Sequence, residues 1–250
     1  MNHSIRKSLS DLGLISAEGP SAAVLEMVQL PGTSRRNFLG RGLAVAAVPA
    51  ALVAASSGAE AGHGNGNGPF PSYYPGATKA KFNEIQVDEY DHNLILTELI
   101  QNLGGTPRPL ASFKGIQNLS PSKFLALSVA FENTGVRAYY GAAPYFSNPN
   151  VLGGAVTIAL VEAYHAGFLN ALANKPLIPN SQPVINPATL NEVVTAVSPF
   201  IVSLNDGGQF PASFDTTPSP ANDIAILNFA LLLEQLEASF YFYNVARLFA

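Results

Sequence analysis

The stretch from Val151 to Asn174, VLGGAVTIALVEAYHAGFLNALAN, decides the fold. Its apolar residues recur at every third or fourth position, which is the spacing of one face of an α-helix. Glu162 and His165 share that face, so both side chains are expected to point into an apolar interior. A carboxylate buried without a partner is costly, and a cation held between it and the imidazole offsets that cost. The stretch therefore predicts a metal-binding helix.

A second pair of the same kind lies upstream, in FNEIQVDEYDHNLILTELI. Glu89 precedes His92 by three residues, on a helix expected from about Thr78 to Leu103 and ended by Gly104-Gly105. A single Glu-x-x-His pair arises often by chance and usually marks an ordinary buried histidine. Two such pairs in a chain with only four histidines indicate one shared site.

Two further helices are expected to carry glutamates on apolar faces. One opens at Ser120-Pro121, a good cap and first-turn pair, and runs to about Ala143 with Glu132 facing inward. The alternative for Glu132 is an ordinary surface position. A long crossover, 175–221, is rich in proline and has room for one short helix near Leu190 to Ser198.

The last helix is NDIAILNFALLLEQLEASFYFYNVARLFA, with a cap expected at Asn222 or Asp223. It carries Glu234 and Glu237 within an apolar run, where a carboxylate is not needed for solubility. Tyr139 follows Glu132 by seven residues, and Tyr241 follows Glu234 by seven. This repeated spacing favours Glu234 as the main ligand on the last helix and leaves Glu237 as a further candidate.

Together the four helices supply the ligands of a di-metal carboxylate bundle, namely four carboxylates and two imidazoles for two divalent ions. Four negative charges balance two divalent cations, so the loaded site can be buried. Such ligands suit iron or manganese better than soft-ligand copper or structural zinc. The expected metal ligands are Glu89, His92, Glu132, Glu162, His165 and Glu234, with Glu237 beside them.

Composition limits the alternatives. The 250 residues are 48% hydrophobic and only 12% charged, which suits one sizeable core rather than a disordered chain. The net charge of -4 gives no basic surface for nucleic acid. The absence of cysteine excludes disulfides, thiolate ligands and cysteine nucleophiles.

The N-terminal region resembles a twin-arginine (Tat) export signal. TSRRNFLG contains Arg35 and Arg36, and a mild apolar run from Gly42 to Ala55 follows, with cleavage expected after Ala61. A membrane anchor is the alternative, but the run is shorter than the roughly 20 residues that span a bilayer. We therefore expect a leader and signal over 1–61, a flexible linker over 62–77, one helical domain over 78–250, and a periplasmic or secreted protein without a stable membrane anchor.

Three segments resemble the ferritin-like domain family that includes the desiccation-related proteins: LNFALLLEQLEASFYFY, AFENTGVRAYYGAAPYF and ALVEAYHAGFLNALAN. The resemblance covers about Phe82 to Asn174 and Ala221 to Ala250, and it implies an all-α, ferritin-like four-helix bundle. In that family the LNFAL-type helix precedes the others, whereas here it is last. A circular permutation, a domain-swapped helix and a mis-assembled gene would each explain this order. We expect a permuted bundle within one chain, because the crossover is long enough to join its ends.

The leading functional expectation is an exported protein that binds two iron or manganese ions and acts on iron, oxygen or peroxide in stress protection. The tyrosines expected beside the site are Tyr139, Tyr140, Tyr164 and Tyr241, although core tyrosines are commoner than functional ones. The alternative, implied by the resemblance, is a non-catalytic desiccation or stress protein with a structural or metal-sequestering role. The expected partners are metal ions, the Tat translocase during export, and a second copy of the chain if it forms a homo-oligomer.

Overall fold

The computed structural model describes residues 77–249 except 212 and 216. The expected leader and signal (1–61) and the expected linker (62–77) lie outside these residues, apart from Ala77, which already belongs to the first described helix.

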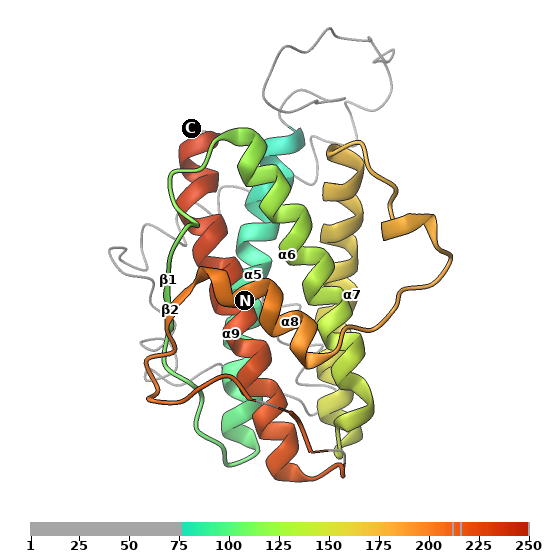
Figure 1. The fold of residues 1–250 in the computed structure, drawn as a ribbon, viewed down its shortest axis with the longest axis vertical. Helices are drawn as coiled ribbons and strands as arrows, with labels where there is room; N and C mark the ends of the chain where they lie inside the picture. Colours follow the sequence, from blue (N-terminus) through green and yellow to red (C-terminus); the bar gives the residue numbers. More distant parts are fainter. Residues whose placement is uncertain (1–76, 212, 216, 250) are drawn as a thin grey trace, which may run out of the picture.

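Four long helices make up the molecule (Figure 1). They are α5 (Ala77–Asn102), α6 (Pro121–Ala142), α7 (Pro149–Leu172) and α9 (Pro220–Leu248). α5 packs against α9, and α6 packs against α7. These are the four helices that the sequence predicts, so the expectation of an all-α four-helix bundle is confirmed.

Three of the long helices begin in the same way. Ser120, Asn148 and Ser219 each cap a helix, accepting a hydrogen bond from a backbone N–H of its first turn. A proline follows each cap, where its missing N–H is not needed and its fixed φ favours the helix. The Ser/Asn-Pro pairs therefore set where α6, α7 and α9 start.

The expected cap of the last helix, Asn222 or Asp223, was wrong, because Ser219-Pro220 starts that helix three residues earlier. Asp223 instead binds the turn between α6 and α7. Its carboxylate accepts hydrogen bonds from the backbone N–H of Ser147 at 2.7 Å and from the Ser147 hydroxyl at 2.8 Å. This contact ties the start of α9 to the neighbouring helix pair.

The two long connections meet on one side of the bundle. The chain from α5 to α6 runs the length of the helices, so α6 starts at the end where α5 starts (Figure 1). On the way, β1 (Ser112–Phe113) pairs antiparallel with β2 (Ile201–Ser203) of the second connection. The sequence pattern, which predicts an all-α fold, does not predict this pair of strands. Strand pairing supplies partners for backbone groups that neither connection could satisfy alone.

The second connection also contains α8 (Leu190–Val197) and two short 3-10 helices, η2 (Pro179–Ser181) and η3 (Ser198–Phe200). A further 3-10 helix, η1 (Ala143–Tyr145), follows α6. α8 starts with a capping box of Thr189 and Glu192. It packs against α6 and, in the view of Figure 1, runs from α6 toward α9. Gly141 makes this approach possible, since a Cβ there would overlap the carbonyl oxygen of Ala188.

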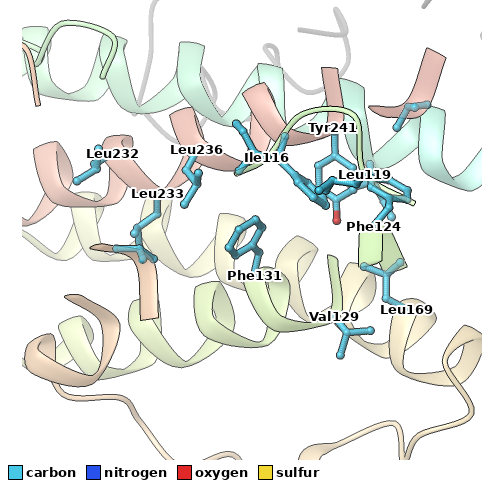
Figure 2. Packing of buried hydrophobic residues seen from close by; sticks show 14 of the residues in the cluster. Ile116, Leu119, Phe124, Val129, Phe131, Leu169, Leu232, Leu233, Leu236 and Tyr241 are labelled. Carbon is cyan, nitrogen blue, oxygen red and sulfur yellow. The ribbon is translucent and has the colours of Figure 1, made fainter. Parts of the chain in front are cut away.

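The buried apolar side chains form two clusters. Figure 2 shows part of the first, which includes Phe124, Phe131 and Tyr241. The second includes Leu96, Ile158 and Leu231. On each long helix the inward-facing glutamate lies between members of the two clusters, so the apolar core surrounds a polar layer.

Two of the described helices, α7 and α9, are long and apolar enough to cross a membrane by length and composition. In α9, 78% of the most apolar window is buried inside the bundle, and in α7 the figure is 39%. Both helices also carry buried carboxylates. The apolar composition of α9 is therefore explained by its burial in the core of the bundle.

We expect Gly141→Ala to destabilise the protein by about 1–3 kcal/mol, because the added methyl group must push the chain at Ala188 away from α6. Gly153→Ala on α7 is the matched control, since a Cβ there meets nothing within 4 Å. It should stabilise the helix by roughly 0.5–1 kcal/mol. Urea unfolding of both variants measures the difference, and two changes of the same sign would contradict the packing of α8 on α6.

Candidate metal centre

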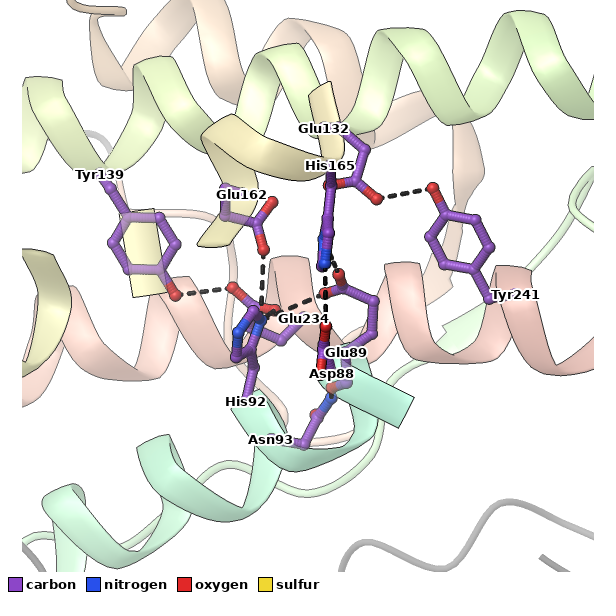
Figure 3. Close-up of polar contacts among 10 residues, drawn as sticks. All are labelled: Asp88, Glu89, His92, Asn93, Glu132, Tyr139, Glu162, His165, Glu234 and Tyr241. Carbon is purple, nitrogen blue, oxygen red and sulfur yellow. Dashed lines mark hydrogen bonds and ion pairs between the residues drawn. The ribbon is translucent and has the colours of Figure 1, made fainter. Parts of the chain in front are cut away.

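All four long helices contribute to one buried cluster of carboxylates and imidazoles (Figure 3). Two sets of four side chains each bring their ligand atoms within 4.8 Å of one another. The first set is Glu89, His92, Glu162 and Glu234, and the second is Glu89, Glu132, Glu162 and His165. The two sets share Glu89 and Glu162, so they are adjacent and have two carboxylates in common.

His92 is the centre of the first set. Its Nδ1 atom lies 3.1 Å from Glu234 Oε2, 3.2 Å from Glu162 Oε1 and 3.4 Å from Glu89 Oε2. These carboxylates come from three different helices, so the bundle itself, rather than a local loop, brings them together.

His165 plays the same part in the second set. Its Nδ1 atom lies 3.0 Å from Glu89 Oε1 and 3.2 Å from Glu132 Oε2. The other ring nitrogen, Nε2, lies 3.1 Å from Asp88 Oδ2. A metal ion at Nδ1 would leave the ring proton on Nε2, where Asp88 accepts it and fixes the orientation of the imidazole.

Most of the carboxylate oxygens in this cluster lie within ion-pair distance of an imidazole nitrogen, but many of its atoms have no partner with the geometry of a hydrogen bond. Among the described residues, both oxygens of Glu89 and of Glu162, Glu132 Oε2 and His165 Nδ1 are buried and make no hydrogen bond. Buried polar atoms are normally satisfied, and an unsatisfied carboxylate is especially costly. These atoms converge on the same small volume, which is the pattern expected of ligands.

The spacing of the donor atoms also fits a metal. Ligands at right angles around an ion with bonds of about 2.1 Å lie about 3 Å apart. The separations between each imidazole Nδ1 and its nearest carboxylates, 3.0 to 3.2 Å, have this value. The residues present therefore fit a pair of divalent ions.

Two tyrosines hold the terminal carboxylates in a reciprocal arrangement. The Tyr139 hydroxyl of α6 donates to Glu234 Oε1 of α9 at 2.6 Å, and the Tyr241 hydroxyl of α9 donates to Glu132 Oε1 of α6 at 2.6 Å. The seven-residue spacing in the sequence thus reflects a pseudo-symmetric arrangement, in which the tyrosine of each helix donates to the glutamate of the other. Burial and the neighbouring carboxylates raise the pKa of both tyrosines well above the usual value, so both remain protonated donors.

The other two tyrosines suggested by the sequence do not lie beside the cluster. Tyr140 is 51% exposed and Tyr164 is 80% exposed. Each directly adjoins an inward-facing residue, and one step along a helix rotates a side chain by about 100°. Their expected role beside the metals was wrong.

Glu237 belongs to neither set of four, although it is buried. Burial and the charge of Glu162, followed by those of Glu89, Glu132 and Glu234, raise its pKa well above the usual value. On α6 the corresponding position is Gly135, and a Cβ there would lie 2.7 Å from Glu162 Oε2. Gly135 therefore makes room for the shared carboxylate, whereas the raised pKa of Glu237 favours its protonated form in the metal-free protein.

The pKa values within the two sets diverge. Burial and the charge of Glu132 raise the pKa of Glu89 to about 7, and burial and the charge of Glu89 raise that of Glu162 well above its usual value. For Glu234, burial raises the pKa, but the charge of His92 and the hydrogen bonds to His92, Glu89 and Tyr139 together outweigh burial, so the pKa is lowered. The metal-free centre therefore retains protons that a bound cation would displace.

A four-helix bundle with buried carboxylates and two Glu-x-x-His pairs is the architecture of the di-metal carboxylate proteins. The chain matches the model of the ferritin-like domain family over residues 44–175, more than half of its length, and it belongs to that family. No curated protein and no solved structure matches it.

The structure brings together the six main ligands expected from the sequence, and it adds one residue that sequence reasoning missed. Asp88 adjoins Glu89 in VDEYDH and supports His165 on a different helix. An acidic residue next to a ligand is a weak signal, because it is equally common on exposed helix surfaces. Only the packing of α5 near α7 identifies its partner.

We expect the metal-free protein to lose stability as pH rises from about 5 to about 7.5. The unfolded chain releases the Glu89 proton near 4.5, whereas the folded chain keeps it until about 7, so the folded state binds more protons in this window. The raised pKa values of His92 and His165 act in the same direction. The lowered pKa of Glu234 makes stability rise with pH, but only at pH values below the usual carboxylate pKa, which lie outside this range.

Thermal unfolding of metal-free protein across this range measures the effect, which should be several degrees. A Glu89→Gln variant should show a flatter profile. A wild-type unfolding temperature that rises with pH without metal would contradict the protonation of the buried cluster.

Proposed function

We propose that this protein binds two iron or manganese ions at the cluster and uses them to handle ferrous iron, dioxygen or peroxide. The observation that supports this most directly is that two sets of four ligands share Glu89 and Glu162, whose four oxygens are buried and make no hydrogen bond among the described residues. A bundle with a purely structural role could fill these positions with apolar side chains at lower cost.

Each residue has a distinct role in this proposal. Glu89 and Glu162, one from each Glu-x-x-His pair, would be shared by the two ions. Glu234 would help to hold the ion beside His92, and Glu132 would help to hold the ion beside His165. Tyr139 and Tyr241 fix the terminal carboxylates by donating to the oxygen that faces away from the imidazole. The four carboxylates offset the charge of two divalent cations.

Iron and manganese are the ions that this mixture of carboxylate and imidazole ligands suits best. When bound, such ions supply two adjacent redox-active centres that can exchange electrons with oxygen species. The chain contributes a dry, preorganised pocket, since Glu89, Glu132 and Glu162 are fully buried. Tyrosine donors that stay protonated hold the ligands without competing for the metals.

The order of helices supports a circular permutation of the family's bundle. The family match ends at residue 175, before α9, and the LNFAL-type sequence lies in α9. α9 nevertheless packs against α5 of the same chain and carries Glu234 to His92. We therefore favour a permuted, intramolecular bundle over a domain-swapped one, within the desiccation-related branch of the family.

Export through the twin-arginine route completes the proposal. Arg35 and Arg36 precede an apolar run that resembles a Tat signal. This route carries folded proteins, so a centre assembled from four helices would be filled before export. A periplasmic or secreted location follows from the proposal.

We expect purified protein to carry close to two metal ions per chain, measured by elemental analysis after expression with iron and with manganese. Glu234→Gln should lose one or both ions, because the lowered pKa of Glu234 keeps its carboxylate charged and His92 lies 3.1 Å away. Glu237→Gln is the matched control on the same helix. It should change the metal content little, since Glu237 belongs to neither set of four side chains.

Circular dichroism should show unchanged helix content in both variants. A metal content near zero in the wild type under both conditions would exclude the proposed function. Full loading of Glu234→Gln together with loss in Glu237→Gln would show that the ligand on α9 is Glu237.

We expect replacement of both Arg35 and Arg36 by lysine to leave unprocessed precursor in the cytoplasm. Cell fractionation with an antibody against the helical domain measures the distribution. Normal appearance of the processed form outside the inner membrane would contradict Tat export, and a processed form retained in the membrane would indicate an anchor.

A further inference from the structure

The two tyrosines that hold the centre have different surroundings. Tyr241 packs within an aromatic group, with ring centroids 4.9 Å from Phe240, 5.9 Å from Phe124 and 6.5 Å from Phe82. Tyr139, its counterpart, lines a cavity of about 560 Å³. One end of the centre is therefore closed by packed rings, whereas the other adjoins open space.

The cavity lies between α6, α8 and α9. Ala138 and Tyr139 of α6 form one wall, Leu190 and Val193 of α8 another, and Phe229, Ala230 and Leu233 of α9 a third. α8 is held in place over this space by the close contact of Gly141 with Ala188 and by a hydrogen bond of 2.9 Å from Ala188 N to Arg137 O.

The lining specifies the chemistry of a ligand. The side chains around this cavity are mostly aliphatic and aromatic, with a few hydroxyl and amide groups, and none is charged. By contrast, a smaller cavity of about 390 Å³ is lined by Arg108 and Asp206, and one of about 510 Å³ is lined by Arg137. Apolar cavities of 300–1,000 Å³ with few polar groups are typical of small-molecule sites. An ion would lack a counter-charge here.

We propose that the cavity between α6, α8 and α9 binds an uncharged, largely apolar organic molecule that contacts Tyr139. The link to the centre is short. The Tyr139 hydroxyl donates to Glu234 Oε1 at 2.6 Å, and Glu234 Oε2 lies 3.1 Å from His92 Nδ1. A molecule that shifts the Tyr139 ring therefore changes the position of a carboxylate beside His92. Binding in the cavity needs no metal, whereas its effect on the centre rests on the proposed function.

The neutral fluorophore N-phenyl-1-naphthylamine is a suitable probe, because its emission rises in apolar surroundings. We expect saturable binding of one probe per chain in both metal-free and manganese-loaded protein. Ala230→Phe, which fills the cavity from α9, should weaken binding about tenfold or more. Ala225→Phe is the matched control, since Ala225 is exposed on the same helix and does not line this cavity.

If Ala230→Phe does not fold, Ala138→Phe fills the same space from α6. Unfolding temperature and helix content identify variants that fold. Tyr139→Phe should still bind the probe, because the ring remains. In the wild type, saturating probe should change the manganese dissociation constant severalfold, and in Tyr139→Phe this change should disappear.

The outcomes separate the two proposals. Absence of saturable binding to folded wild-type protein, or equal binding by folded Ala230→Phe, would overturn the cavity site. Probe binding that depends on Ala230 in a protein that takes up no metal would support the cavity and reject the di-metal centre. A manganese affinity that does not respond to bound probe would overturn the contact through Tyr139.

Discussion

The main constraint on this structure is the burial of several carboxylates around two imidazoles in the middle of an apolar bundle. Glu89, Glu132 and Glu162 are fully buried, and burial together with the neighbouring carboxylate charges raises the pKa of Glu89 and of Glu162. Isolated charges of this kind would destabilise the core. The two apolar clusters, the caps of the helices and the crossover that carries α8 hold the helices in spite of this cost. The cluster is compatible with a metal site, and bound cations would then stabilise the folded chain.

The cluster has a pseudo-two-fold arrangement, but the half around His92 differs from the half around His165. The reciprocal pairs Tyr139–Glu234 and Tyr241–Glu132 are equivalent. In contrast, Gly135 on α6 corresponds to Glu237 on α9, and Asp88 contacts His165 rather than His92. Of the two paired tyrosines, Tyr139 borders the cavity of about 560 Å³ and Tyr241 does not. If the centre holds two ions as proposed, such differences would give them unequal affinities, and the cavity would admit a ligand from one side only.

Much of this architecture could be predicted from the sequence, because its signals are local. Helix periodicity, the Glu-x-x-His spacing and the Ser120-Pro121 cap are each contained within a few residues, and the structure bears out the helices they predict. The features that were missed depend on contacts between distant segments. Asp223 reads as a cap until the α6–α7 turn is placed beside it, and β1 is too short to be recognised without β2. The exposure of Tyr140 and Tyr164, the partner of Asp88 and the cavity beneath α8 likewise follow only from packing.

The most direct test of the account is anomalous diffraction from crystals of the protein grown with manganese, with data collected on both sides of the manganese absorption edge. The account predicts two anomalous peaks in each chain, both contacting Glu89 and Glu162, one beside His92 and Glu234 and the other beside His165 and Glu132. A well-ordered cluster without an anomalous peak, or a single peak held outside these residues, would contradict it.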